Sequence, residues 1–135
     1  MASRVRQAKN GDQPSLETAA LQRWFNPDFL AANPDVATYI IGRLRNNDPD
    51  RFIESYELLS QAEDHSVDYS ALSMPALILT GDGDEGSTPL MAKKMAQAML
   101  NARAEIIQGS KHIGIIELHK QFSDALISFM SESVI

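Results

Sequence analysis

An aspartate and a histidine lie in two loops whose composition points to catalysis. Asp84 belongs to the loop 81–89, Gly-Asp-Gly-Asp-Glu-Gly-Ser-Thr-Pro, and His112 belongs to the loop 109–117, Gly-Ser-Lys-His-Ile-Gly-Ile-Ile-Glu. A carboxylate bonded to one imidazole nitrogen fixes the tautomer of the ring, and the other nitrogen then serves as general base to a nucleophile. Asp84 and His112 could therefore be two members of a catalytic triad.

Each loop follows a candidate strand, of which the first is a short apolar run typical of a buried strand and the second is marked by Ile106-Ile107. The two segments are 76–80 and 103–108. Between them, Pro89 follows a serine and a threonine, which is typical of a helix start, and a helix is expected to continue to about Leu100. A helical crossover makes neighbouring strands parallel, so we expect both loops at the same edge of the sheet, within hydrogen-bonding reach of each other.

The first half of the chain has the pattern of helices. Apolar residues at spacings of three and four follow Pro14, Pro34 and Pro49, each of which can occupy the first turn of a helix. A last amphipathic helix is marked by apolar residues within 118–129. The fold class is therefore predicted as α/β, a helical segment followed by strand, helix, strand and helix. The expected parts are a flexible tail at 1–13, a helical segment at 14–68 and the α/β portion at 69–135.

Composition excludes several classes of function. The 135 residues include 12 Lys+Arg and 18 Asp+Glu, a net charge of −6 without a basic run, so no nucleic-acid partner is expected. There is no cysteine for a disulfide framework or a thiolate metal site. No segment approaches the roughly 18 apolar residues that span a bilayer, and no signal peptide is evident. We expect a cytoplasmic protein with no membrane segment and no cofactor.

The acidic residues around Asp84 could also suggest calcium, but their spacing does not fit. Counting from Asp82, an EF-hand loop would need glycine where Ser87 stands and glutamate where Lys93 stands. No metal site is therefore predicted. Two simpler interpretations stay open, because Gly-Asp-Gly-Asp is turn chemistry in its own right and His112 could be a surface loop histidine.

Two ordered motifs resemble the carboxyl-terminal half of the α/β-hydrolase family, roughly over residues 70–130. In that family a proline and an apolar strand are followed by Gly-x-x-Asp and a later proline, and the segment 75–89 has this pattern. The segment 109–112, with Glu117 and an amphipathic last helix after it, resembles the histidine loop of the family. The resemblance implies the fold of an α/β-hydrolase core and hydrolysis of ester or lactone bonds.

By position in these motifs, Asp84 rather than Asp82 matches the catalytic acid, and His112 matches the catalytic histidine. The family carries its serine nucleophile on a Gly-x-Ser-x-Gly elbow that precedes the acid in chain order. No such motif is present in this sequence. The nucleophile and the oxyanion-hole loop are therefore expected to precede Met1, and the chain alone is expected to be inactive.

The helical segment 14–68 resembles the cap of 3-oxoadipate enol-lactonases and their relatives. The similarity lies in 21–25, in Pro27-Asp28-Phe29 and in Asn33-Pro34. In that family the cap closes over the substrate, which implies that Arg23 and Trp24 could contact a small carboxylate or lactone ligand in the complete enzyme. A tryptophan is more often a core anchor than a ligand contact, so Trp24 could instead be a core residue.

Three interpretations of function remain at this stage. The chain is a portion of an ester or lactone hydrolase, or a non-enzymatic dimerising or ligand-binding module with the same fold, or one half of an enzyme whose other half is a separate polypeptide. In a complete α/β-hydrolase, the strand that corresponds to 76–80 is flanked on one side by the strand that corresponds to 103–108. On its other side lies a strand that precedes the cap, and this sequence has no such strand, so one edge of 76–80 is expected to be open. Because an unpaired strand edge is a template for another chain, we expect a homo-oligomer, with a twofold dimer as the simplest form.

Overall fold

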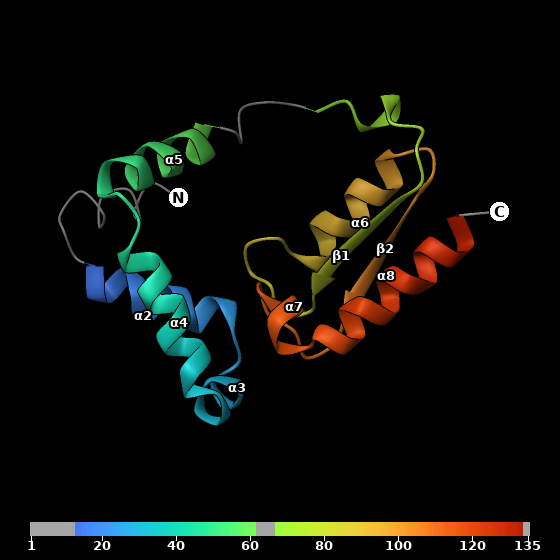
Figure 1. Cartoon of the computed structure of the whole chain (residues 1–135). Helices are drawn as coiled ribbons and strands as arrows, with labels where there is room; N and C mark the ends of the chain where they lie inside the picture. Colours follow the sequence, from blue (N-terminus) through green and yellow to red (C-terminus); the bar gives the residue numbers. More distant parts are fainter. Residues whose placement is uncertain (1–12, 62–66, 134–135) are drawn as a thin grey trace. The chain divides into compact units, whose positions relative to one another are not determined.

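The structure is a computed structural model of the chain, and it describes residues 13–61 and 67–133 (Figure 1). The tail expected at 1–13 lies outside the described residues, except for Gln13, where helix α2 begins. The chain divides into two compact units. Among the described residues, the first unit holds 13–22, 30–61 and 67. The second unit holds Arg23–Phe29 and residues 68–133.

The three helices expected in the first half are confirmed, and a fourth lies between them. Their bounds are α2 Gln13–Trp24, α4 Pro34–Arg45 and α5 Pro49–Gln61, and the unexpected short helix is α3 Pro27–Ala32. Proline occupies the first turn of α4, as its fixed backbone angle favours. Ahead of α5, the Asp48 side chain accepts hydrogen bonds from the backbone N–H groups of Asp50 at 2.9 Å and Arg51 at 3.1 Å, which caps the helix.

An ion pair joins two helices of the first unit. The buried Glu17 carboxylate on α2 accepts hydrogen bonds from Nε and Nη2 of Arg45 on α4, both at 2.9 Å. This two-point contact matches the planar guanidinium to the carboxylate, and it fixes the angle of approach as well as the distance. Ala20 and Ile40 are the buried apolar residues on these two helices.

The second unit is built around a parallel pair of strands. Strand β1, Ala76–Gly81, pairs with β2, Ala102–Ile107, and Gly81 lies opposite Ile107 at the end of the register. Helix α6, Pro89–Ala98, forms the crossover between the strands, and the Thr88 side chain caps it. The prediction that both loops open at one edge of the sheet is confirmed.

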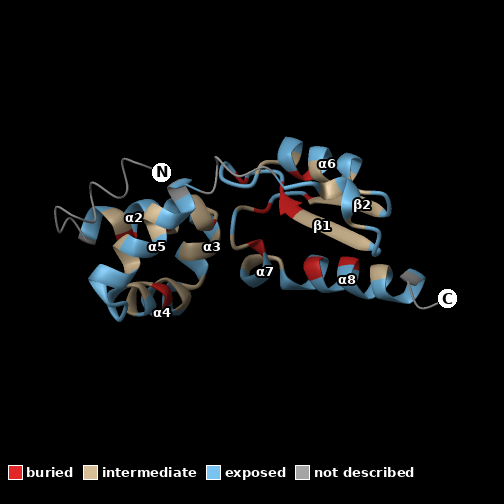
Figure 2. Cartoon of the chain, turned by 90° about the horizontal axis from the view of Figure 1, so that it is seen from above, coloured by how far each residue is buried: buried red, intermediate tan, exposed pale blue. Residues whose placement is uncertain are grey.

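Helices cover both faces of this small sheet. Helix α6 lies on one face and α8, His119–Ser133, on the other (Figures 1 and 2). The core is made by Ile107, Phe122 and Ala125, with Leu79 and Leu118 packed against it. Two short elements complete the unit, the 3-10 helix η2 at Tyr69–Ala71 and α7 at Gly114–Glu117. Among the described residues, no helix is long and apolar enough to cross a membrane.

Candidate acid and histidine site

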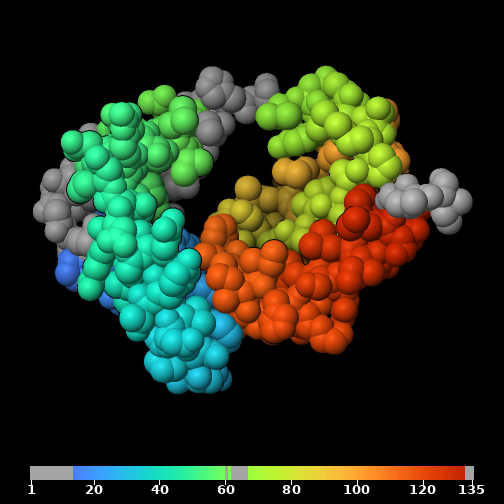
Figure 3. Space-filling model, viewed as in Figure 1, coloured from blue at the N-terminus to red at the C-terminus, as the bar shows by residue number. Residues whose placement is uncertain are grey.

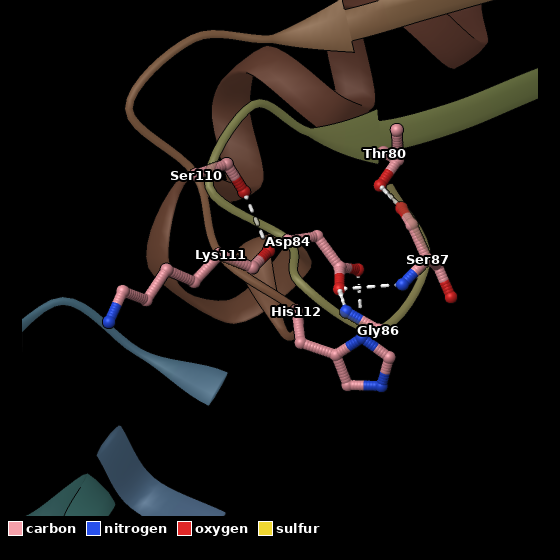
Figure 4. A network of polar contacts seen from close by, with 7 residues as sticks. All are labelled: Thr80, Asp84, Gly86, Ser87, Ser110, Lys111 and His112. Carbon is pink, nitrogen blue, oxygen red and sulfur yellow. Dashed lines mark hydrogen bonds and ion pairs between the residues drawn. The ribbon is translucent and has the colours of Figure 1, made fainter. Parts of the chain in front are cut away.

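Asp84 and His112 form a direct hydrogen bond between the two loops at the carboxyl edge of the sheet. The distance from His112 Nδ1 to Asp84 Oδ2 is 2.8 Å (Figure 4). Asp84 is only 5% exposed, whereas the His112 side chain is 41% exposed. The carboxylate is therefore enclosed by the protein while the ring that it contacts reaches the surface.

The second oxygen of Asp84 is held by its own loop. Asp84 Oδ1 accepts hydrogen bonds from the backbone N–H groups of Gly86 at 2.7 Å and Ser87 at 2.8 Å (Figure 4). The loop is closed further by the Thr80 hydroxyl, which donates to the Ser87 carbonyl at 2.6 Å. Gly86 lies close to the pair, since a Cβ built there would be 3.4 Å from Asp84 Oδ1. These contacts leave Oδ2 directed at the imidazole.

The electrostatics of Asp84 favour its charged form. Burial raises the pKa of the Asp84 carboxyl, but the two loop amides and the His112 ring together outweigh burial, so that the pKa lies below the ordinary value of an aspartate. An ionised carboxylate only accepts hydrogen bonds, so at neutral pH His112 Nδ1 must carry the proton between them. The lone pair of the neutral ring is then on Nε2, where a general base needs it.

Asp82, two residues earlier, serves a different purpose. Its Oδ1 accepts a hydrogen bond from the backbone N–H of Ser110 at 3.2 Å, and its own N–H donates to the Ile107 carbonyl at 3.1 Å. The next residue, Gly83, donates its N–H to the Ser110 carbonyl at 2.9 Å. Asp82 therefore connects the two loops by bonding to backbone groups of Ile107 and Ser110.

Glycines allow the loops to approach so closely. A Cβ at Gly81 would collide with the backbone carbonyl of Ser110, and a Cβ at Gly114 would collide with the Ser110 side chain and lie 2.7 Å from Phe122 Cε2. Gly109 has a φ of 73°, a left-handed conformation that side chains disfavour. The histidine loop can therefore follow its path only because these positions lack side chains.

The segment Trp24–Asn26 is bonded to the histidine loop at three places. The Ile113 N–H donates to the Trp24 carbonyl at 3.0 Å. The Asn26 amide nitrogen donates to the Gly109 carbonyl at 2.7 Å and to Glu117 Oε1 at 2.6 Å, and the Asn26 backbone N–H donates to Glu117 Oε2 at 3.3 Å. Sequence reasoning missed Asn26, because nothing local indicates a partner 91 residues away.

Two solved structures are similar to this fold. The structure matches an enol-lactonase from Burkholderia xenovorans LB400 with a TM-score of 0.83 and 25% identity, over 96% of this chain and 49% of that chain. It also matches BpoC, a candidate non-heme bromoperoxidase from Mycobacterium tuberculosis H37Rv, with a TM-score of 0.69 and 18% identity, over 99% of this chain and 52% of that chain. The chain has the fold of the carboxyl-terminal half of an α/β-hydrolase. No family model and no curated protein matches its sequence.

The chain spans about half the length of the α/β-hydrolase structures that it matches. The resemblance inferred from the acid and histidine motifs is thus confirmed for the fold. At 18% identity the match to BpoC concerns the fold alone.

The side chains of Arg23 and Trp24 contact each other, and both residues belong to the second unit. The Arg23 guanidinium carbon is 5.9 Å from the centre of the Trp24 ring, a favourable cation–π distance. Both residues are partly buried. Their suggested contacts with a substrate stay a prediction.

Proposed function

We propose that this chain is the acid and histidine half of an α/β-hydrolase that cleaves ester or lactone bonds. The observation that carries the proposal is the hydrogen bond of 2.8 Å between His112 Nδ1 and the buried Asp84 carboxylate. The similarity to an enol-lactonase supports a cyclic ester as the substrate class. Because one fold hosts many reactions, this support depends on the match being accompanied by the acid and histidine pair and by 25% sequence identity.

In the proposed mechanism His112 Nε2 removes the proton of a serine hydroxyl, which attacks the carbonyl carbon of the substrate. Asp84 holds the ring in the correct tautomer and stabilises the imidazolium that forms. His112 then gives the proton to the leaving oxygen as the ester C–O bond breaks. In the second half of the reaction the same ring removes a proton from a water molecule, which attacks the acyl-serine, and the proton returns to the serine oxygen as the acid product leaves. The 135 residues contain no Gly-x-Ser-x-Gly elbow, so we propose that the nucleophile and the oxyanion donors come from residues outside this sequence.

We further propose that Arg23 and Trp24 contact the substrate in the complete enzyme. The guanidinium would pair with a carboxylate on a small-molecule ligand, and the indole would pack against its carbon skeleton. The cation–π contact between the two side chains supports their joint orientation.

Hydrolysis of an activated ester and of a simple lactone by the purified chain tests the proposal. We expect no turnover that depends on Asp84 or His112, because the covalent step lacks its nucleophile. The controls are Asp84→Ala and His112→Ala, and weak ester hydrolysis that is insensitive to both comes from surface side chains. Turnover that survives repurification and disappears in Asp84→Ala would contradict the proposed division of the triad.

A further inference from the structure

Asn26 is bonded on both sides of the catalytic histidine. The chain from Gly109 to Glu117 carries His112 near its middle, and Asn26 reaches the first residue through its side chain and the last through both its side chain and its backbone. Between these contacts, the Ile113 N–H donates to the Trp24 carbonyl at 3.0 Å. The histidine loop is thus held at residues 109, 113 and 117 by a segment distant in sequence.

We propose that Asn26 is a positioning residue for His112. This inference rests on the proposed function, since it gives Asn26 a part in the same site. The His112 side chain is 41% exposed and its Nδ1 is bonded to Asp84, so the backbone of the histidine loop sets how the ring meets the carboxylate. Gly109, at the start of the loop, is in a left-handed conformation that glycine adopts without steric cost. Loss of the Asn26 contacts would let the loop relax and would move Nδ1 away from the Asp84 carboxylate.

The chemistry of the asparagine side chain fits this position. Its amide nitrogen carries two hydrogens, and the structure places one acceptor for each, the Gly109 carbonyl at 2.7 Å and Glu117 Oε1 at 2.6 Å. An aspartate of the same size has no donor and would face Glu117 with a like charge. Asn26→Asp therefore removes the two side-chain contacts with almost no change in volume.

The same contacts link His112 to two helices. Asn26 stands between the end of α2 at Trp24 and the start of α3 at Pro27. A change in how these helix ends are held would reach the histidine loop through residues 24–26. The alignment of the general base would then depend on residues 24–26 as well as on the sheet.

NMR tests the proposal without any substrate. The chemical shifts of the two ring nitrogens of His112 at neutral pH report which of them carries the proton. The unaltered chain should have its proton on Nδ1. We expect Asn26→Asp to lower the population of the Nδ1–H tautomer, relative to the other forms of the ring, by about fivefold or more. This is the effect of losing one ordinary hydrogen bond, here the bond from Nδ1 to Asp84. Asn101→Ala, the removal of an exposed asparagine at the opposite end of the strands, should leave the ring unchanged.

Glu117 supplies a second route if Asn26→Asp does not fold. Glu117→Gln keeps an acceptor for the Asn26 amide and should retain most of the Nδ1 tautomer, whereas Glu117→Ala should lose it. A folded Asn26→Asp or Glu117→Ala chain with an unaltered His112 ring would overturn the positioning role alone. A ring in the unaltered chain with its proton on Nε2 and none on Nδ1 would refute the pairing with Asp84, and with it both proposals.

Discussion

Two aspartates separated by one glycine make different contacts, and the difference supports the proposed role of Asp84. Asp84 directs one carboxylate oxygen to His112 and the other to two backbone amides, whereas Asp82 accepts from the Ser110 amide. The family motif favoured Asp84 from the sequence. The hydrogen bonds explain why that position is suited to orient a histidine.

At the scale of single residues, Asp84→Ala should destabilise the chain more than Asp82→Ala. Removal of the Asp84 carboxylate breaks two part-buried hydrogen bonds from the N–H groups of Gly86 and Ser87 and the bond to His112, which we expect to cost about 1–3 kcal/mol in total. The exposed Asp82 loses a single bond of 3.2 Å, so its removal should have the smaller effect. Urea denaturation of both variants measures the difference, and equal losses would contradict it.

Stability should also depend on the charge of Asp84 at low pH. Because folding lowers the pKa of Asp84, the unfolded chain binds the proton more readily than the folded chain. The stability that this carboxylate contributes is complete above its unfolded pKa of about 4 and is lost as the pH falls through the lower folded value. The free energy of unfolding should therefore fall more steeply below pH 4 for the unaltered chain than for Asp84→Asn. Parallel curves would exclude this contribution.

At the scale of elements, the close contact between the two loops depends on Gly81. We expect Gly81→Ala to destabilise the chain by about 1–3 kcal/mol, because the new methyl group meets the rigid Ser110 backbone. Gly42 is the matched control, since a Cβ built there meets nothing within 4 Å in helix α4. Gly42→Ala should stabilise its helix by about 0.5–1 kcal/mol. Thermal unfolding compares them, and a tolerated Gly81→Ala would mean that the loops can separate.

The elements that position the site were largely predictable from sequence, and their long-range contacts were not. Strands β1 and β2 and helix α6 were predictable because their signals are local. Thr88-Pro89 marks the start of α6, and the apolar residues before and after that helix mark the two strands. Helix α3 was missed, since six residues are too few for a periodic pattern. Asn26 was missed for a different reason, because its partners become neighbours only after folding.

At the scale of the whole molecule, we predict a homodimer. Among the described residues β1 pairs only with β2, so the other edge of β1 has no partner strand, and an open edge can pair with a second copy. Helix α8 lies on the surface of the second unit (Figure 3) and exposes apolar side chains, namely Leu126, Ile127 and Met130. Sedimentation equilibrium at micromolar concentration should give twice the mass of the chain. A stable monomer would contradict this prediction.

The central claim is that Asp84 and His112 are the acid and base of a hydrolase whose nucleophile lies elsewhere. The most direct measurement is lactone hydrolysis by a chimera in which this chain replaces the matching half of the Burkholderia enol-lactonase. We predict turnover that falls by about 10²- to 10⁴-fold in Asp84→Ala and in His112→Ala, the usual contribution of general acid–base catalysis. A folded chimera without turnover, or turnover that neither substitution reduces, would contradict the account.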